Sequence, residues 1–182
     1  GKSYITALTI IKDSQNKEKC NYLIITTAPN ETITQQRDVL DSKQLEDFNI
    51  IILNGKTKKT ILKDKNIIIC SKQFLQSKIE NTEKTNIIKW LKKLKVDIRF
   101  IDESHNGGTT ELAKKTLEYY GNNSFTIQIT ATYSKPIIDF NIPKENWILW
   151  DLEDVNLCKK IHEEKSINRL IEKHGEDIKI LL

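Results

Sequence analysis

The chain has 182 residues, of which 38% are hydrophobic and 30% are charged. These proportions suit one globular domain with a substantial core and exclude a disordered or a membrane-embedded chain. The net charge of +4 is compatible with a nucleic-acid partner but is too small to argue for one.

The cysteines at positions 20, 70 and 158 are odd in number and widely separated. They lack the spacing of a zinc site or of a disulfide framework. We therefore predict free, buried thiols and an intracellular, reducing location.

The chain opens with Gly1-Lys2-Ser3, followed by an apolar helix pattern over residues 4–11. Gly-Lys-Ser matches the end of the phosphate-binding loop pattern G-x-x-x-x-G-K-[ST]. In such a loop, backbone N–H groups hold phosphates, the lysine reaches the outer phosphates and the serine hydroxyl binds Mg²⁺. The first glycine of the pattern, the strand before it and any methionine are absent from the sequence, so we expect an internal piece of a longer protein.

Short apolar runs alternate with helix patterns along the chain. Runs rich in β-branched and aromatic residues predict strands at 21–27, 49–53, 66–71, 96–101, 125–130 and 147–150. Helix patterns cover 31–40, 87–94 and 110–120, and in the tail one helix begins after Asp151 and extends to His162, and another spans 166–173. Gly121 stands where a left-handed residue ends a helix. Residues 56–65 predict a solvated loop or a short helix.

This alternation predicts an α/β fold with a parallel sheet covered by helices on both faces. Right-handed crossovers place the carboxyl ends of all the strands at one edge of the sheet, where ligands bind. Polar residues gather at four of these ends: 27–30, 71–73, 102–105 and 130–132. We therefore expect the functional site at this edge.

Two groups of polar residues favour a structural explanation. The lysines between the apolar positions of 87–94 are expected to form a solvated helix face rather than a binding stripe. His162 and His174 in the tail are expected to be solvent-exposed.

Five segments together resemble, in the correct order, motifs I, Ia, Ib, II and III of the first RecA-like domain of superfamily 2 helicases and translocases. They are Gly1-Lys2-Ser3, Thr27-Ala28-Pro29-Asn30 with Gln35, Ser71-Lys72-Gln73, Asp102-Glu103-Ser104-His105 and Thr130-Ala131-Thr132. The tetrad has the D-E-x-H form, and the set is similar to the helicase subunits of type III restriction enzymes. The resemblance extends from residue 1 to about residue 136.

The resemblance implies a RecA-like P-loop fold that uses ATP and Mg²⁺. Gly1, Lys2 and Ser3 would bind the nucleotide, and Ser3 and Asp102 would bind the metal. Glu103 would orient or deprotonate the attacking water, and Asp102 and Lys2 would assist catalysis. His105 would couple nucleotide state to Thr130 and Thr132, unless it is a structural surface histidine.

The resemblance also implies a nucleic-acid partner, with DNA favoured over RNA, and no membrane. The residues assigned to the nucleic-acid backbone are Ala28, Pro29, Asn30, Ser71, Lys72 and Gln73. Side chains of these types suit phosphate contacts and read no bases, so binding would be independent of base sequence and sensitive to salt. The same residues are also compatible with capped turns that have only a structural role.

We expect residues 1–182 to form the first RecA-like domain without its first strand, and a second RecA-like domain to lie elsewhere in the polypeptide. That second domain supplies an arginine finger worth roughly 10³ to 10⁵ in rate, so the isolated chain should hydrolyse ATP weakly or not at all. Two alternatives remain: a RecA-like scaffold with weak or no ATPase activity, and a packaging-type motor ATPase, which the tetrad and Pro29 disfavour.

Overall fold

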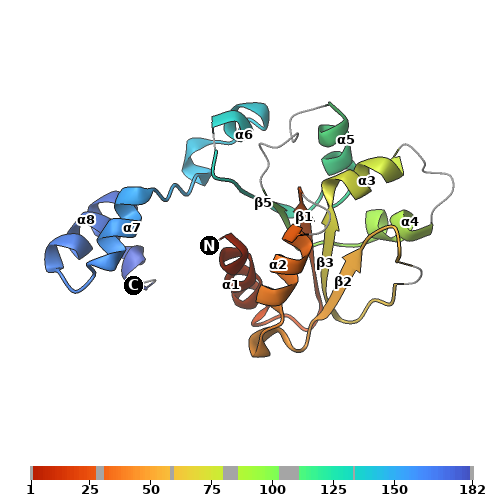
Figure 1. Ribbon diagram of the computed structural model, residues 1–182, viewed down its shortest axis with the longest axis horizontal. Coiled ribbons are helices and arrows are strands. Elements are labelled where there is room, and N and C mark those ends of the chain that lie inside the picture. Colours follow the sequence, from red (N-terminus) through yellow and green to blue (C-terminus); the bar gives the residue numbers. More distant parts are fainter. Residues whose placement is uncertain are drawn as a thin grey trace. The chain divides into compact units, whose positions relative to one another are not determined.

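The computed structural model describes residues 2–27, 31–57, 60–79, 86–102, 111–132 and 134–180. The chain divides into two compact units, residues 1–141 and 142–182, which we describe separately (Figure 1).

The first unit is built on a sheet of five parallel strands. They are β1 (Cys20–Thr26), β2 (Asn49–Leu53), β3 (Lys65–Ser71), β4 (Ile98–Asp102) and β5 (Phe125–Ile129), in the order β2-β3-β1-β4-β5. Each strand lies within two residues of its predicted position. The predicted parallel α/β fold is therefore confirmed.

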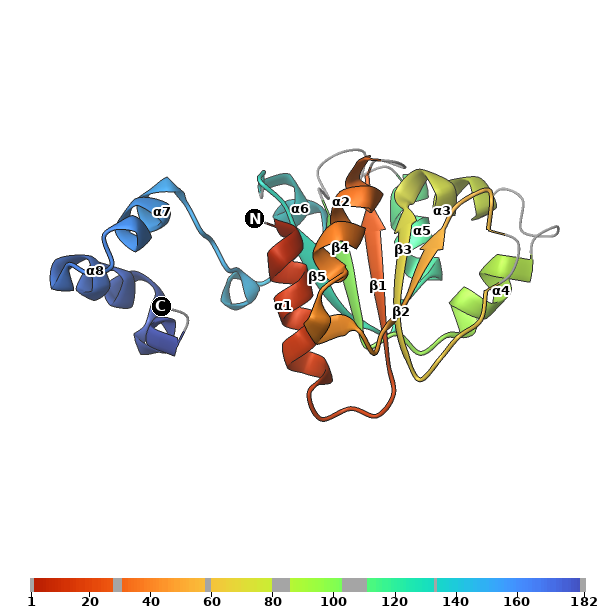
Figure 2. The same ribbon diagram turned by 60° about the horizontal axis from the view of Figure 1, so that its bottom comes forward.

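Helices cover both faces of this sheet. One face carries α1 (Lys2–Ser14) and α2 (Glu31–Leu40), which lie side by side in Figure 2, with the short 3₁₀ helix η1 (Lys43–Leu45) after them. The other face carries α3 (Lys72–Ile79), α4 (Asn86–Lys93) and α5 (Glu111–Tyr119). A further short helix, α6 (Ser134–Asp139), follows β5.

The two cores follow from the alternation of side chains along each strand. On β1, Tyr22 and Ile24 pack in the cluster that includes Ala7 of α1 and Leu40 of α2. Leu23 and Ile25 pack in the opposite cluster. Strands buried on both faces need near-continuous apolar runs, which explains why the strand signals in the sequence are strong.

Polar bonds fasten the far end of α1 to the sheet. Asp13 near the end of α1 accepts a hydrogen bond from the Tyr22 hydroxyl on β1 at 2.7 Å and pairs with Lys17 at 2.6 Å. Lys17 also pairs with Asp97 just before β4 at 3.2 Å, and Asp97 accepts a bond from the backbone N–H of Asn21 at 2.9 Å. These contacts fix α1 on β1 and β4, and so fix the direction in which its first turn points.

The second unit contains η2 (Lys144–Asn146), α7 (Leu152–Lys159), α8 (Glu164–His174) and η3 (Glu176–Ile180). Asp151 caps α7 as predicted, because its side chain accepts a bond from the backbone N–H of Asp154, and the Asp154 side chain accepts one from the backbone N–H of Asp151. The helix ends at Lys159, before the predicted Ile161 and His162.

Two expectations for the tail are wrong. Residues 147–150 form no strand, and Ile148 is 93% exposed, because no other strand in the described part of the chain pairs with them. His174 is not a solvent residue: it lies 2.8 Å from the buried carboxylate of Asp154, and its ring stacks on Trp150. His162 is exposed, as expected.

All three cysteines are free thiols; Cys20 and Cys70 are buried, and Cys158 is partly exposed. Among the described helices, none combines the length and the apolar character that crossing a membrane requires.

Candidate nucleotide site at the carboxyl edge of the sheet

The carboxyl ends of the parallel strands meet at one edge of the sheet, as parallel pairing requires. Thr26 at the end of β1 pairs with Ser71 at the end of β3, and Asp102 at the end of β4 pairs with Ile129 of β5. All four of the predicted polar clusters thus have described residues at these strand ends or directly after them.

Strand alternation decides which way Asp102 faces. Phe100 and Ile98, two and four residues earlier on β4, pack in the cluster that includes residues of α1 and α2. Asp102 shares their side of the strand, so its carboxylate points toward those two helices. The residue is only 7% exposed, which places an ionisable group in a largely desolvated position.

The first turn of α1 supplies a cation for this carboxylate. Lys2 precedes the buried Thr6 by one turn, and the Thr6 hydroxyl donates to the Lys2 carbonyl at 3.4 Å. The Lys2 ammonium lies close enough to attract the Asp102 carboxylate electrostatically. The structure therefore brings together the N-terminal lysine and the mid-chain acid, which 100 residues separate in the sequence.

Burial and these neighbours act on Asp102 in opposite directions. Burial raises the pKa of the Asp102 carboxyl above its ordinary value, because desolvation disfavours the charged form. The Lys2 ammonium and a hydrogen bond from Gln36 lower the pKa and offset part of that rise. A cation at this place would favour the ionised carboxylate further.

Gln36 is a site residue that the sequence interpretation missed, since only its neighbour Gln35 was included in the motif. It lies on the second turn of α2, is 2% exposed and hydrogen-bonds to the Asp102 carboxylate. The sequence held one sign that Gln36 faces inward. It precedes the buried Leu40 by four residues, and that spacing places both on one face of a helix.

The residues present suit a magnesium ion. Asp102 Oδ1 and Gln36 Oε1 are buried oxygens that accept no hydrogen bond within the described part of the chain. Ser3 lies on the first turn of α1 and is partly exposed. Carboxylate, amide and hydroxyl oxygens are the hard ligands that Mg²⁺ prefers, and Lys2 beside them is suited to phosphate.

The other predicted site residues divide into three groups, the last of which is the segment 71–73. Gly1, Ala28, Pro29, Asn30, Glu103 and His105 lie outside the described residues. Thr130 is partly exposed and Thr132 is exposed. They form a local turn, in which the Thr130 hydroxyl accepts a bond from the Thr132 N–H at 3.1 Å and donates one to the Thr132 carbonyl at 3.0 Å.

The segment 71–73 joins β3 to α3. The Ser71 hydroxyl accepts a bond from the Phe74 N–H at 3.1 Å, and Ser71 is 2% exposed. Lys72 is 6% exposed, and burial lowers its pKa to about 8. Gln73 is exposed, so of these three side chains it is the one most open to a partner.

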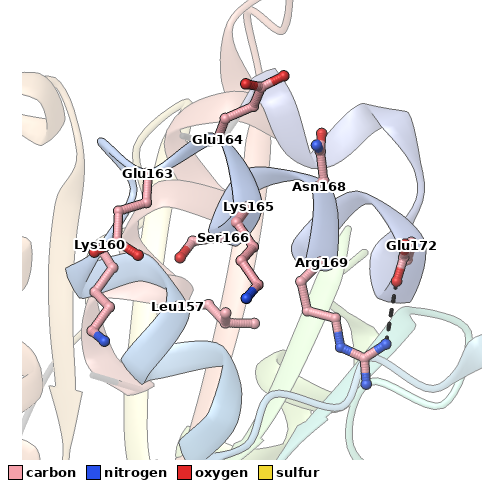
Figure 3. A pocket seen from close by; sticks show the side chains of 9 residues that line it. All are labelled: Leu157, Lys160, Glu163, Glu164, Lys165, Ser166, Asn168, Arg169 and Glu172. Carbon is pink, nitrogen blue, oxygen red and sulfur yellow. Dashed lines mark hydrogen bonds and ion pairs between the residues drawn. The ribbon is translucent and has the colours of Figure 1, made fainter.

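A separate hollow lies in the second unit, between α7 and α8 (Figure 3). Mostly charged residues line it, including Lys160, Glu163 and the ion pair Arg169–Glu172 at 3.3 Å. None of the predicted site residues lines this hollow.

Comparison with known families gives independent evidence on the fold. Residues 1–135 match the family described as type III restriction enzyme, res subunit. A comparison with curated proteins found no match. Together with the parallel sheet, the family match confirms a RecA-like P-loop domain. Because the match covers more than half of the 182 residues, the chain belongs to the family of type III restriction enzyme res subunits, as a helicase-type ATP-binding domain.

Proposed function

We propose that the chain is the ATP-binding motor domain of a superfamily 2 DExH helicase or translocase, which couples ATP hydrolysis to movement on nucleic acid or to its unwinding. One observation carries the proposal: Lys2 at the start of α1 attracts the Asp102 carboxylate at the end of β4 electrostatically, at the carboxyl edge of the sheet. A lysine and an acid in this relation suit the phosphates and the metal of one magnesium nucleotide.

Each residue then has a distinct task. Lys2 and the backbone N–H groups at the start of α1 hold the phosphates, where the positive end of the helix favours negative charge. Ser3 and Asp102 hold the metal, and Glu103 orients or deprotonates the attacking water. Magnesium, when bound, neutralises charge that develops on the phosphates.

The nucleic acid, DNA in preference to RNA, lies across residues 28–30 and 71–73. Its backbone is contacted without base recognition, so affinity falls steeply with salt. The exposure of Gln73 supports a contact there. His105 links the nucleotide to Thr130 and Thr132, and the free thiols support an intracellular location.

A second RecA-like domain of the same polypeptide completes the ATPase site. Its arginine finger contributes roughly 10³ to 10⁵ in rate, so residues 1–182 alone hydrolyse ATP slowly.

The test is nucleic-acid-stimulated ATPase activity in the complete polypeptide. Lys2→Ala and Glu103→Gln should each abolish stimulated turnover. Lys12→Ala, an exposed lysine near the other end of α1, should retain it. Full activity in Lys2→Ala would refute the proposal, and a wild-type protein without turnover on any DNA or RNA would favour a scaffold role.

A further inference from the structure

Gln36 and Asp102 are two buried polar side chains from different elements that face each other. Gln36 belongs to α2 and Asp102 to the end of β4, and the Gln36 amide hydrogen-bonds to the carboxylate. A carboxylate only accepts, so the Gln36 NH₂ group is the donor. Buried amides and carboxylates are costly to desolvate, and such a pair therefore needs an explanation.

The hydrogen-bonding groups of these two side chains are only partly used. One oxygen of each side chain, Asp102 Oδ1 and Gln36 Oε1, accepts no hydrogen bond within the described part of the chain. Buried polar atoms in proteins are usually hydrogen-bonded, so two such oxygens on neighbouring side chains point to a partner that the described part of the chain does not supply. Both are acceptors, so a group that satisfies them must be a donor or a cation.

We propose that Gln36 is a positioning residue, which holds one oxygen of the Asp102 carboxylate so that the other is presented to the magnesium of the bound nucleotide. The inference rests on the proposed function. Magnesium demands near-ideal octahedral geometry, so a carboxylate that rotates freely binds it less well than one held in place. Partners of metal ligands typically contribute about 10- to 100-fold to metal affinity or activity.

The position of Gln36 suits this task. Alternation on β4 directs Asp102 toward α1 and α2, and these helices contribute one neighbour each. Lys2 of α1 supplies charge, whereas Gln36 of α2 supplies a directional bond without charge. Gln36 therefore orients the carboxylate without adding a second positive charge, which would compete with the metal for Asp102.

Two substitutions and one control test the proposal. Gln36→Leu keeps the approximate size and removes the amide. Gln36→Met also keeps the approximate size and removes the amide, without adding a charge beside Asp102. Arg37→Ala alters the next residue of α2, which is exposed.

The measurement is equilibrium binding of fluorescent ADP, first with Mg²⁺ titrated in and then with the metal removed by a chelator. Both Gln36 variants should require about tenfold more Mg²⁺ to reach tight binding, with unchanged affinity in chelator. Arg37→Ala should match the wild type in both conditions. A merely structural role would weaken binding with and without the metal, and that outcome would overturn the proposal.

Two further outcomes separate the inference from the proposed function. If the wild type binds nucleotide tightly only with Mg²⁺ and Gln36→Leu behaves identically, the inference fails and the proposed function stands. If the wild type binds no nucleotide, both fail. Thermal unfolding of the nucleotide-free variants controls for folding, and Gln36→Met gives the decisive comparison if Gln36→Leu unfolds.

Discussion

Lys72 is a charged residue in a position that disfavours charge. It begins α3 at the end of β3, is 6% exposed, and burial lowers its pKa from 10.5 to about 8. Between these two values the unfolded chain binds more protons than the folded protein. The free energy of unfolding must therefore rise with pH from about 8 to 10.5.

Lys72→Met should remove this dependence, because methionine keeps the apolar stem without the ammonium. Relative to the variant, the wild type should gain at most about 3 kcal/mol across this pH window. Urea unfolding at pH 7.5 and pH 10 measures the difference, and Lys89→Met, at an exposed position on α4, is the matched control. Equal pH slopes in wild type and Lys72→Met would show that Lys72 is not desolvated.

At the level of elements, one arginine and one glycine specify the junction at the end of α5. Arg99 of β4 donates to the carbonyls of Leu117 and Tyr120 at the end of the helix, and to the hydroxyl of Thr126 on β5. Gly121 follows with a φ of +68°, where an added Cβ would lie 3.3 Å from the Arg99 side chain. One arginine thus joins β4, α5 and β5.

Gly121→Ala should lower the free energy of unfolding by about 1–2 kcal/mol, because a left-handed backbone is strained for any residue with a Cβ. Gly55→Ala is the control, since no atom lies within 4 Å of its added Cβ and its φ is not positive. It should change stability by less than about 0.5 kcal/mol. Denaturant unfolding compares the two, and equal effects would contradict the account of this junction.

The elements that the sequence predicted well share one property: their own residues determine them. β1 and β3 are continuous apolar runs, and Gly121 marks a helix end by its conformational freedom. Residues 147–150 have the composition of a strand but lack a pairing partner in the described part of the chain. Composition alone carries no information about such a partner.

The candidate site, too, could be predicted from the sequence only in part. Lys2 and Asp102 could be proposed from the sequence because ordered motifs mark them. Gln36 was missed because its role depends on which face of α2 packs against β4, and that is a property of tertiary structure. His174 was misassigned for the same reason, since Asp154 and Trp150 meet it only after α7 and α8 pack.

At the scale of the whole molecule, the second unit has a polar centre of its own. The fully buried Asp154 binds the Asp151 N–H at 2.7 Å, His174 at 2.8 Å and Lys173 at 3.0 Å. Burial alone would raise the pKa of Asp154, but these three partners lower it well below 3.8. The stabilisation that ionised Asp154 gives to the folded protein is therefore complete above its unfolded-state pKa near 4. It is lost as the pH falls through the lower pKa of the folded state.

Asp154→Ala should increase amide hydrogen exchange in α7 and α8 by roughly tenfold or more, because a buried cap and two helix contacts are lost. Exchange in β1 and β4 should stay the same, since these strands belong to the other unit. Glu172→Gln removes only the exposed pair with Arg169 and should have little effect. Equal exchange in wild type and Asp154→Ala would contradict a central role for this carboxylate.

The central claim is that Lys2 and Asp102 act on one magnesium nucleotide. The most direct measurement is the affinity for magnesium ATP of the wild type, Lys2→Ala, Asp102→Asn and the double variant. The effects of substituting two residues that share a ligand and attract each other should not add. Each single variant should therefore lose at least about tenfold in affinity, and the double variant should bind only slightly more weakly than the single variant with the larger loss. The account would be contradicted if the loss of affinity in the double variant equalled the product of the two single losses, or if either single variant bound magnesium ATP as tightly as the wild type.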